Sequence, residues 1–340
     1  MSKILTFGEI MMRLQPYGYK RLLQANGLEM TFGGGEANVA VSLAQMGDDA
    51  AFLTKLPNNE LGKASSNQLR YWGVNTDYIV RGGERMGIYF CEKGASQRAS
   101  KVIYDRKNSA INSINEDEVD FDNLLKTTEW LHFTGITPAL SDEVANFTKL
   151  LLIKAKEKNI TVSCDLNYRN KLWTREKANI VMSNLMQYVD VLISNEEDCK
   201  DVFGIVAGKS DITSGELSKE DYGDVAKTLA KKFGIKIVAF TLRESISASI
   251  NNWSGILVDS GKVYSSKKYT LNIVDRVGGG DSFGAGLIHS LTNGKNPQEA
   301  IEFAIAASAL KHSVEGDFNI ATVEEIEKLA NGDGSGRVQR

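Results

Sequence analysis

Apolar and polar residues alternate along the chain with two different periods. Short apolar runs bounded by turn residues predict buried strands, and apolar residues that recur every three or four positions predict helices. Strands are predicted at residues 3–8, 50–56, 87–92, 101–104, 130–135, 161–165, 189–194, 236–240, 247–258 and 262–264. Helices are predicted at residues 37–46, 61–72, 143–158, 177–187, 222–233, 281–291, 297–312 and 322–331.

Strands and helices take turns through most of the chain after residue 130. Such alternation, with helices of about 10 to 15 residues, is typical of a parallel sheet covered by helices on both faces. Residues 247–264 interrupt it with a pattern that predicts a β-meander. No internal repeat and no linker rich in Pro, Gly or Ser divides the chain. We therefore predict a doubly wound, mostly parallel α/β fold in a single domain over residues 1–333, with a short Gly-rich tail at 334–340.

Composition restricts the kinds of partner. Of the 340 residues, 42% are hydrophobic and 24% are charged, which is ordinary for a soluble globular protein. The net charge of −3 and the lack of a long basic run disfavour nucleic acids and membrane surfaces as partners. Three scattered cysteines predict reduced thiols in the cytoplasm. No apolar run approaches the roughly 18 residues of a membrane span.

The run Gly278-Gly279-Gly280, followed by Asp281, stands directly before a predicted helix. Glycine adopts positive φ without strain and lets a ligand approach the backbone closely. The first N–H groups of a helix have no partner inside the helix and carry the positive end of its dipole. This stretch therefore predicts a site for phosphate or for developing negative charge, with Asp281 as the reactive group within reach. The alternative is a tight turn in which Asp281 merely caps the helix.

Polar residues follow three of the predicted strands. Asp165–Arg169, Asn195–Asp198 and Thr241–Ser245 each begin where a strand is expected to end. Ligands of doubly wound sheets bind beyond the carboxyl ends of the strands. These loops and the glycine turn together predict a binding site at one edge of the sheet.

Two familiar nucleotide-binding motifs are incomplete in this chain. Gly204–Ser210 has one residue too few between its glycines for a P-loop, and it follows a helical pattern where a strand is required. Gly278 and Gly280 begin a dinucleotide-binding pattern, but Phe283 replaces its third glycine. Neither motif is therefore assigned a function.

Two glycine-rich stretches, Gly33–Ala40 and Asp275–Asp281, resemble the amino-terminal and carboxy-terminal motifs of the ribokinase-like (PfkB) carbohydrate kinases. The second motif more often reads Asp-Thr-x-Gly-Ala-Gly-Asp in that family. The resemblance extends over almost the whole chain, although Leu242–Ser245 lacks the glycines that relatives carry near the nucleotide. Within the family the chain is most similar to the 2-keto-3-deoxygluconate kinases, through Gly8-Glu9, Tyr104–Arg106, Asp165–Arg169 with Trp173, and Lys311–Asp317.

The resemblance implies a role for each motif. Asp281 is the general base that takes the proton of the sugar hydroxyl, and the N–H groups of Gly278, Gly279 and Gly280 stabilise the transferring phosphoryl group. The residues implied in substrate binding are Gly34, Glu36, Asn38, Tyr89, Tyr104, Arg106, Arg169, Asp281 and Asp317. Those implied in nucleotide binding are Asn167, Asn195, Thr241, Arg243, Gly278 and Gly280. Mg²⁺ would be held through water by Glu197 or Asp198, and the sequence leaves open which.

Insertions at about residues 10–33 and 84–106 would form a small β lid, as in relatives. Lids exclude water from phosphoryl transfer, and in relatives they also pair between subunits. The resemblance therefore implies a homodimer or a higher homo-oligomer. An ordinary hairpin at the edge of the sheet is the alternative for these strands.

The resemblance implies a kinase that uses ATP and Mg²⁺ to phosphorylate the 6-hydroxyl of the sugar acid 2-keto-3-deoxygluconate. The sequence does not distinguish this substrate from its C4 epimer, 2-keto-3-deoxygalactonate. A kinase of the same fold for a neutral sugar such as fructose or ribose, or for a nucleoside, is the nearest alternative. A catalytically silent sugar-binding regulator is an alternative from another class, because a fold alone does not establish activity.

Overall fold

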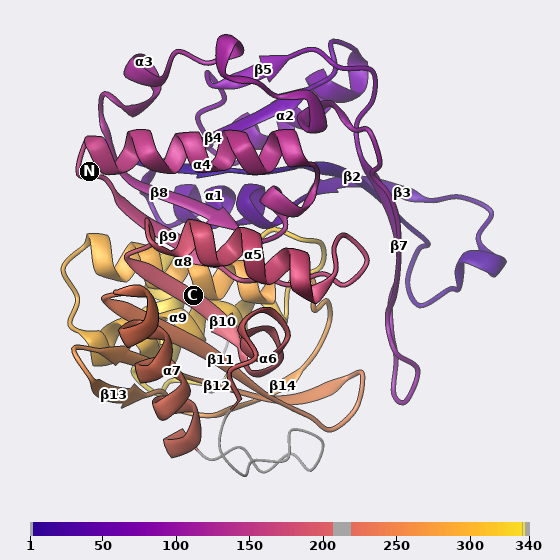
Figure 1. Cartoon of the computed structure of the whole chain (residues 1–340). Coiled ribbons are helices and arrows are strands. Elements are labelled where there is room, and N and C mark those ends of the chain that lie inside the picture. Colours follow the sequence, from indigo (N-terminus) through magenta and orange to yellow (C-terminus); the bar gives the residue numbers. More distant parts are fainter. Residues whose placement is uncertain (1–2, 207–218, 335, 337–340) are drawn as a thin grey trace.

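A mostly parallel sheet runs through the protein and is covered by helices on both faces (Figure 1). The computed structural model describes residues 3–206, 219–334 and 336. The sheet has ten strands, in the order β13-β12-β11-β10-β9-β8-β1-β4-β5, with β14 paired to β12. Its strands are β1 (Lys3–Phe7), β4 (Asp49–Leu56), β5 (Ile79–Arg81), β8 (Thr128–Thr134), β9 (Thr161–Asp165), β10 (Val191–Asn195), β11 (Ile237–Ser245), β12 (Ile250–Asp259), β13 (Lys262–Ser265) and β14 (Tyr269–Asn272).

Strands β5 to β11 along this order pair in parallel, whereas β12 pairs antiparallel with each of its neighbours. The buried strands are rich in residues such as Val162 and Leu192 with no exposed surface, because a parallel sheet is covered on both sides. The predicted α/β class with a mostly parallel sheet is confirmed.

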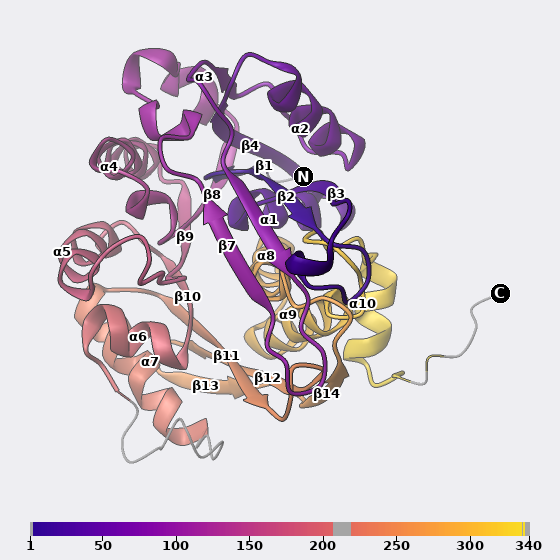
Figure 2. The same ribbon diagram turned by 90° about the vertical axis from the view of Figure 1, so that its right-hand side faces the viewer.

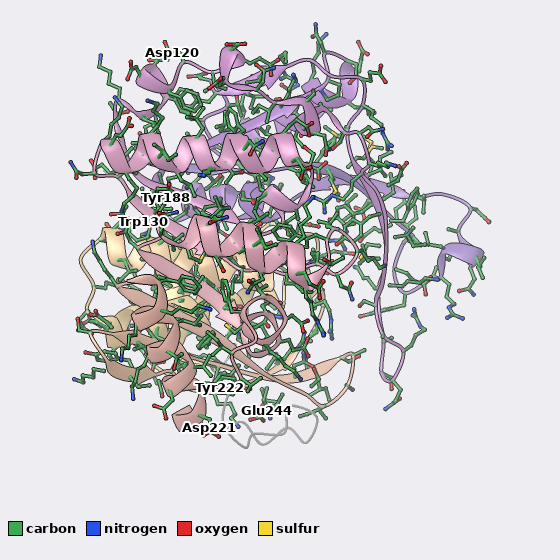
Figure 3. The ribbon with its side chains drawn as sticks, in the orientation of Figure 1. Asp120, Trp130, Tyr188, Asp221, Tyr222 and Glu244 are labelled. Carbon is green, nitrogen blue, oxygen red and sulfur yellow. The ribbon has the colours of Figure 1, made fainter. Side chains whose placement is uncertain are left out.

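Helices form two layers, one on each face of the sheet. The helices are α1 (Gly35–Gln45), α2 (Glu60–Tyr71), α3 (Phe121–Leu125), α4 (Asp142–Glu157), α5 (Arg175–Met186), α6 (Glu196–Phe203), α7 (Lys219–Phe233), α8 (Gly279–Thr292), α9 (Pro297–Lys311) and α10 (Val323–Ala330). Helices α3 to α7 belong to one hydrophobic core and α1, α8, α9 and α10 to another. Side chains fill the space between sheet and helices (Figure 3), as where Tyr222 of α7 packs 6.2 Å from Phe240 of β11, measured between ring centroids.

A second sheet of four strands, in the order β3-β2-β6-β7, stands apart from the first (Figures 1 and 2). Its strands are β2 (Met11–Gln15), β3 (Glu29–Gly33), β6 (Ile88–Glu92) and β7 (Lys101–Asp105). All four lie within the two stretches that the sequence analysis treats as insertions. The tip of the β6–β7 hairpin touches the β11–β12 hairpin, where the Ala248 N–H donates to the Ser96 carbonyl at 2.8 Å.

Several elements differ from the predictions. Residues 11–15 and 29–33 form strands although their pattern is irregular, because they pair with each other and residues 11–15 also pair with β6. Thr241–Ser245 was predicted as a loop, and this was wrong: β11 continues to Ser245 because it pairs residue by residue with β12. Of the P-loop-like stretch, Gly204 ends α6 with φ 67°, and residues 207–210 lie outside the described residues. Of the predicted tail, residues 335 and 337–340 also lie outside them.

Cys91, Cys164 and Cys199 are buried and form no disulfide with one another. None of the helices in the described part of the chain combines the length and the apolar character that crossing a bilayer requires.

Candidate active site

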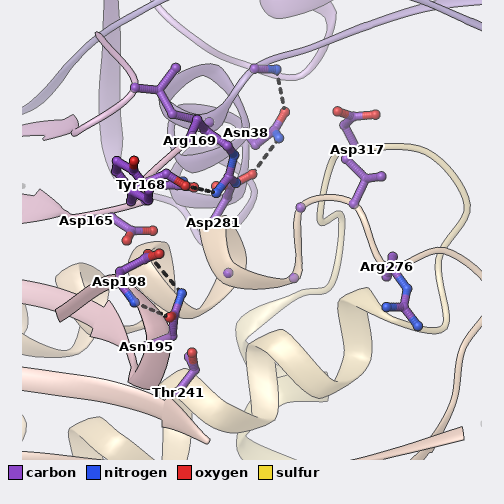
Figure 4. A pocket seen from close by; sticks show the side chains of 18 of the residues that line it. Asn38, Asp165, Tyr168, Arg169, Asn195, Asp198, Thr241, Arg276, Asp281 and Asp317 are labelled. Atoms are coloured by element: carbon purple, nitrogen blue, oxygen red, sulfur yellow. Dashed lines mark hydrogen bonds between the residues drawn. The ribbon is translucent and has the colours of Figure 1, made fainter. Parts of the chain in front are cut away.

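A cavity of about 550 Å³ lies where the central sheet, the small sheet and the start of α8 meet (Figure 4). The carboxyl ends of β9, β10 and β11 form its floor, and residues of β2, β6 and β7 form its opposite wall. Every residue that the sequence analysis assigned to substrate, nucleotide, metal or catalysis lines this cavity. The fold therefore brings together residues that are separated by most of the length of the chain.

The glycine turn forms the first turn of α8. Gly278 caps the helix with φ 83°, and Asp281 is the third residue after it. The alternative that Asp281 caps the helix was wrong, because Gly278 occupies the cap position and Asp281 lies inside the first turn. Of the three glycines only Gly278 has a positive φ.

The three glycines are needed for different reasons. A Cβ atom on Gly278 would lie 2.0 Å from the Asp317 carbonyl oxygen, and one on Gly279 would lie 2.5 Å from the His312 ring. A Cβ atom on Gly280 would meet nothing within 4 Å. Packing therefore requires glycine at the first two positions, and Gly280 borders open space beside Asp281.

Asp281 is held by one side chain. The Asn38 amide nitrogen donates to the Asp281 Oδ2 at 2.7 Å, and the Asn38 Oδ1 accepts from the Gly34 N–H at 3.2 Å (Figure 4). Burial raises the pKa of Asp281 to about 6, although the bond from Asn38 opposes the rise. A carboxylate with a pKa close to neutrality accepts and returns a proton readily, which suits a general base.

Two further carboxylates lie near Asp281, Asp165 at the end of β9 and Asp198 in the first turn of α6 (Figure 4). Burial raises the pKa of Asp165 well above its ordinary value, and the charges of Asp198 and Asp281 add to the rise. Burial likewise raises the pKa of Asp198 to about 6. Asp165 was not among the predicted site residues, although its place at the end of a strand was a signal for it.

Asn195 begins α6 in place of the predicted loop. Its Oδ1 accepts from the N–H groups of Glu197 and Asp198, both at 2.9 Å, and its amide nitrogen donates to the Asp198 Oδ2 at 2.9 Å. Glu197 is exposed at the rim, whereas Asp198 is buried. Among the residues that the structure describes, no group of three or more His, Cys, Asp or Glu is arranged to hold a metal ion, so the Mg²⁺ assignment stays a prediction.

Arg106 is paired with Glu9, which the sequence analysis did not include in the site. The Arg106 Nε donates to the Glu9 Oε2 at 2.8 Å, and a second N–H of the guanidinium contacts the same oxygen. The Ser109 hydroxyl donates to the Glu9 Oε1 at 2.5 Å. The Arg106 guanidinium also lies 5.4 Å from the centre of the Tyr104 ring, so its orientation over the cavity is fixed from two sides.

Arg169 stands at the end of the loop after β9 and is exposed. It donates to the Tyr168 carbonyl at 2.9 Å, and no carboxylate in the described part of the chain forms an ion pair with it. Its charge lowers the pKa values of Asp198 and Asp281 against the larger effect of burial. Asn167 in the same loop has φ 40° and lines the cavity.

Asp317 and Tyr89 belong to a buried network centred on Arg13. The Arg13 Nη1 donates to the Asp317 Oδ1 and its Nη2 to the Asp275 Oδ2, each at 2.5 Å. The Tyr89 hydroxyl donates to the Asp317 Oδ2 at 2.5 Å. Both oxygens of Asp317 therefore have partners, and its role as a substrate ligand stays a prediction. Arg13 has no exposed surface. The sequence analysis did not include it in the site, although its position between Met12 and Leu14 in a strand places its side chain on the face opposite to theirs.

Glu36 links α1 to the end of β8 through hydrogen bonds. Its Oε1 accepts from the Thr134 N–H at 2.9 Å and from the hydroxyls of Thr134 and Thr137 at 2.8 and 2.5 Å. Burial raises its pKa to about 7. Glu36 and Gly34 border the cavity, but the described bonds of Glu36 serve the fold.

Thr241 and Arg243 lie on the extended part of β11, opposite Gly255 and Trp253 of β12. They line the end of the cavity that Arg276 and His312 also line. Arg276 was not predicted as a site residue, although it replaces the Thr that is more common at this position of the motif.

Comparison with known proteins agrees with this arrangement. The pfkB family carbohydrate kinase model matches residues 1–322. The chain is 33% identical over 335 residues to a 2-dehydro-3-deoxygalactonokinase of Haloferax volcanii, covering 98% of each. It is 27% identical to a 2-dehydro-3-deoxygluconokinase of Bacillus subtilis, covering 96% of this chain and 94% of the relative.

A solved structure shows the same fold. The crystal structure of the 2-dehydro-3-deoxygluconokinase of Thermotoga maritima is 51% identical, with a TM-score of 0.94, and the match covers 98% of this chain and 100% of that one. The ribokinase-like fold expected from the sequence is thereby confirmed. On the sequence match and the shared fold, the chain belongs to the pfkB family of carbohydrate kinases.

Proposed function

We propose that the protein transfers the γ-phosphoryl group of ATP to the 6-hydroxyl of 2-keto-3-deoxygluconate or its C4 epimer, 2-keto-3-deoxygalactonate. The observation that carries this proposal is the position of Asp281 in the first turn of α8, beside the open space at Gly280. A proton acceptor and the positive end of a helix thus border one point of the cavity. The names of the relatives, which include both epimers, support this substrate class.

The reaction follows from this geometry. The hydroxyl oxygen of the sugar attacks the γ-phosphorus, its proton passes to the Asp281 carboxylate, and the bond to ADP breaks. Asn38 holds the carboxylate in place through its 2.7 Å bond. The free N–H groups at the start of α8 stabilise the charge on the phosphoryl oxygens.

ATP and Mg²⁺ are the proposed cofactors. Thr241, Arg243, Asn167 and Asn195 line the part of the cavity that would receive ATP. Asp198 with Glu197 would hold Mg²⁺ through water. Burial raises the pKa values of Asp198 and of Asp165 nearby, and crowded carboxylates of this kind favour a hard cation with oxygen ligands. When bound, the ion would neutralise charge on the phosphates.

Arg106 and Arg169 are the proposed partners of the substrate carboxylate. Guanidinium groups bind carboxylates through two parallel hydrogen bonds, and each such charged bond contributes about 1.5–3 kcal/mol. The pairing of Arg106 with Glu9 favours a neutral sugar as the second candidate substrate, because that pair already cancels one positive charge.

An ATP-coupled assay separates the candidates. Wild type is tested on ketodeoxygluconate, ketodeoxygalactonate, fructose, ribose and adenosine, and then in the variants Arg106→Leu and Arg169→Leu. We expect each variant to lose about ten- to a hundredfold in kcat/KM on the sugar acid and less on fructose. Arg70→Leu, on exposed α2 outside the cavity, is the matched control. Equal losses on acid and neutral substrates would contradict the sugar-acid proposal, and binding without turnover would favour a silent regulator.

We also propose that the small sheet acts as a lid and joins two subunits. Its β6–β7 hairpin reaches the β11–β12 hairpin across the cavity. Its outer strand β7 is mostly exposed and carries apolar side chains at Ile103 and Tyr104. Exposed edge strands of this kind pair readily with a second strand.

A further inference from the structure

Arg276 differs from the other buried or half-buried arginines near the cavity. Its Nη2 donates to the Ala248 carbonyl at 3.0 Å, but its Nε is buried and has no partner within the described chain. The Nε of Arg13 is also buried without a partner, but Arg13 and Arg106 are both paired with carboxylates, whereas Arg276 forms no ion pair with the described residues. A buried charged donor without a partner is costly unless a ligand satisfies it.

The nearest carboxylate in the sequence does not pair with Arg276. Asp275 accepts from Arg13 at 2.5 Å, from the Gly316 N–H at 3.2 Å and from the Val277 N–H at 3.1 Å. Its oxygens are therefore taken by groups other than Arg276. The guanidinium of Arg276 instead lines the cavity.

A second arginine strengthens the positive charge at this end of the cavity. Arg243 lines the same cavity and is exposed there. Burial lowers the pKa of Arg276, and the charge of Arg243 lowers it further, whereas the charge of Asp275 opposes this effect. Burial also lowers the pKa of His312 to about 4, with the charges of Lys311, Arg276 and Arg243 adding to this effect.

Charged groups of both signs surround the glycine turn. Asp165 and Asp198 lie on one side of it, and Arg276 lies on the other side, where Asp317 also lies (Figure 4). Asp317 is already paired with Arg13 and Tyr89. An extended anion is therefore attracted to the Arg276 guanidinium and repelled from Asp165 and Asp198. The N-terminus of α8 lies between the two sides.

We propose that Arg276, together with Arg243, forms a subsite for the phosphates of the nucleotide that remain on ADP after transfer. This inference rests on the proposed kinase function. Negative charge develops on the oxygen that links the transferred phosphoryl group to ADP as the bond breaks. Guanidinium groups at this position stabilise that charge, so they assist the departure of ADP as well as its binding.

The test measures binding of inorganic pyrophosphate, ADP and adenosine by calorimetry, without added metal. Wild type is compared with Arg276→Gln and Arg243→Gln, and Arg70→Gln on α2 is the matched control. We expect Arg276→Gln to weaken pyrophosphate and ADP about ten- to a hundredfold and to leave adenosine nearly unchanged. Pyrophosphate bound by Arg276→Gln as tightly as by wild type would overturn the proposal.

A second measurement needs no variant, in case Arg276→Gln does not fold. Wild type is treated with an arginine-specific dicarbonyl reagent, and modification at each arginine is followed by mass spectrometry. Pyrophosphate should protect Arg276 and Arg243 but not Arg70, and equal modification with and without pyrophosphate would overturn the proposal. If wild type binds pyrophosphate through Arg276 yet phosphorylates none of the tested sugars, the proposed function fails and this subsite stands.

Discussion

Asp281 illustrates how the surroundings of one residue set its chemistry. Its position three residues after Gly278 places it beside the free N–H groups of α8, and Asn38 fixes its carboxylate. Burial raises its pKa to about 6, so it is charged at neutral pH and still close to exchanging its proton. A solvated aspartate, with a pKa near 3.9, would be a weaker base.

The Asp281→Asn variant should fold and bind ligands but lose about 10²- to 10⁴-fold in kcat, because the amide cannot take a proton. Initial rates with ATP and ketodeoxygluconate measure the loss, and thermal unfolding checks the fold. Asp48→Asn is the control, because Asp48 pairs with His289 away from the cavity. Near-normal turnover in folded Asp281→Asn would remove this residue from the mechanism.

The pH dependence follows from the raised pKa. The unprotonated carboxylate is the active form, so kcat/KM should fall about tenfold per pH unit below about pH 6. The folded protein also binds this proton more tightly than the unfolded chain, so the carboxyl favours folding most at acid pH and loses that contribution as the pH rises from about 4 to 6. The Tm of Asp281→Asn minus the Tm of wild type should therefore increase over this pH range. A constant difference would mean that the pKa is not raised.

At the scale of elements, the glycine turn at the start of α8 packs against the loop that carries Asp317. Gly278 packs against the backbone of Asp317, and Gly279 packs against His312 after α9. The turn is therefore fixed by its neighbours, and only Gly280 faces open space. Substitutions at Gly278 and at Gly280 are therefore expected to have opposite effects on stability.

Gly278→Ala should destabilise the protein by more than about 1 kcal/mol, since alanine resists a φ of 83° and its Cβ would meet a carbonyl oxygen at 2.0 Å. Gly280→Ala should keep or slightly raise stability, because alanine favours a helix, but should lower kcat by filling space beside Asp281. Urea unfolding and initial rates measure both effects. A stable Gly278→Ala variant, or a fully active Gly280→Ala variant, would contradict this division.

Arg13 links β2 of the small sheet to the loops around the glycine turn. Removing one partner of a buried ion pair leaves uncompensated charge and typically costs about 3–5 kcal/mol. Arg13→Met should destabilise the protein by that amount in urea unfolding, because both Asp275 and Asp317 lose their partner. Arg85→Met, which breaks the exposed pair with Asp105 on the same sheet, should cost at most about 1 kcal/mol. Equal effects of the two substitutions would show that the Arg13 network does not hold the small sheet.

At the scale of the whole molecule, the small sheet closes one side of the cavity and leaves β7 as an outer edge (Figure 2). Ile103 and Tyr104 expose 43% and 41% of their surface on this strand. If β7 pairs with a second subunit, Ile103→Lys should shift the protein towards the monomer, as measured by analytical ultracentrifugation. Ile180→Lys on α5 is the control, since Ile180 is 64% exposed away from that edge. Identical sedimentation of Ile103→Lys and wild type would contradict the lid-mediated dimer.

The sequence by itself determined the order of most strands and helices and the residues that gather at the cavity. Apolar periodicity reports on burial within a few residues, so β9 was predicted at its observed bounds, Thr161–Asp165. The glycine motif likewise reports on local backbone, since Gly278 does adopt a positive φ. Shorter or weakly patterned strands such as β5 and β14 were missed because neighbouring strands stabilise them.

The tertiary structure alone decided which charged side chains form ion pairs. Arg13 and Asp317 are 304 positions apart, and Arg106 and Glu9 are 97 apart, so no local pattern couples them. It also decided that Arg276 has no carboxylate partner in the described chain, and that Thr241 and Arg243 belong to a strand. The physical reason is that the energy of a charge depends on the groups around it in space and on its distance from water. Sequence order specifies neither quantity until the chain has folded.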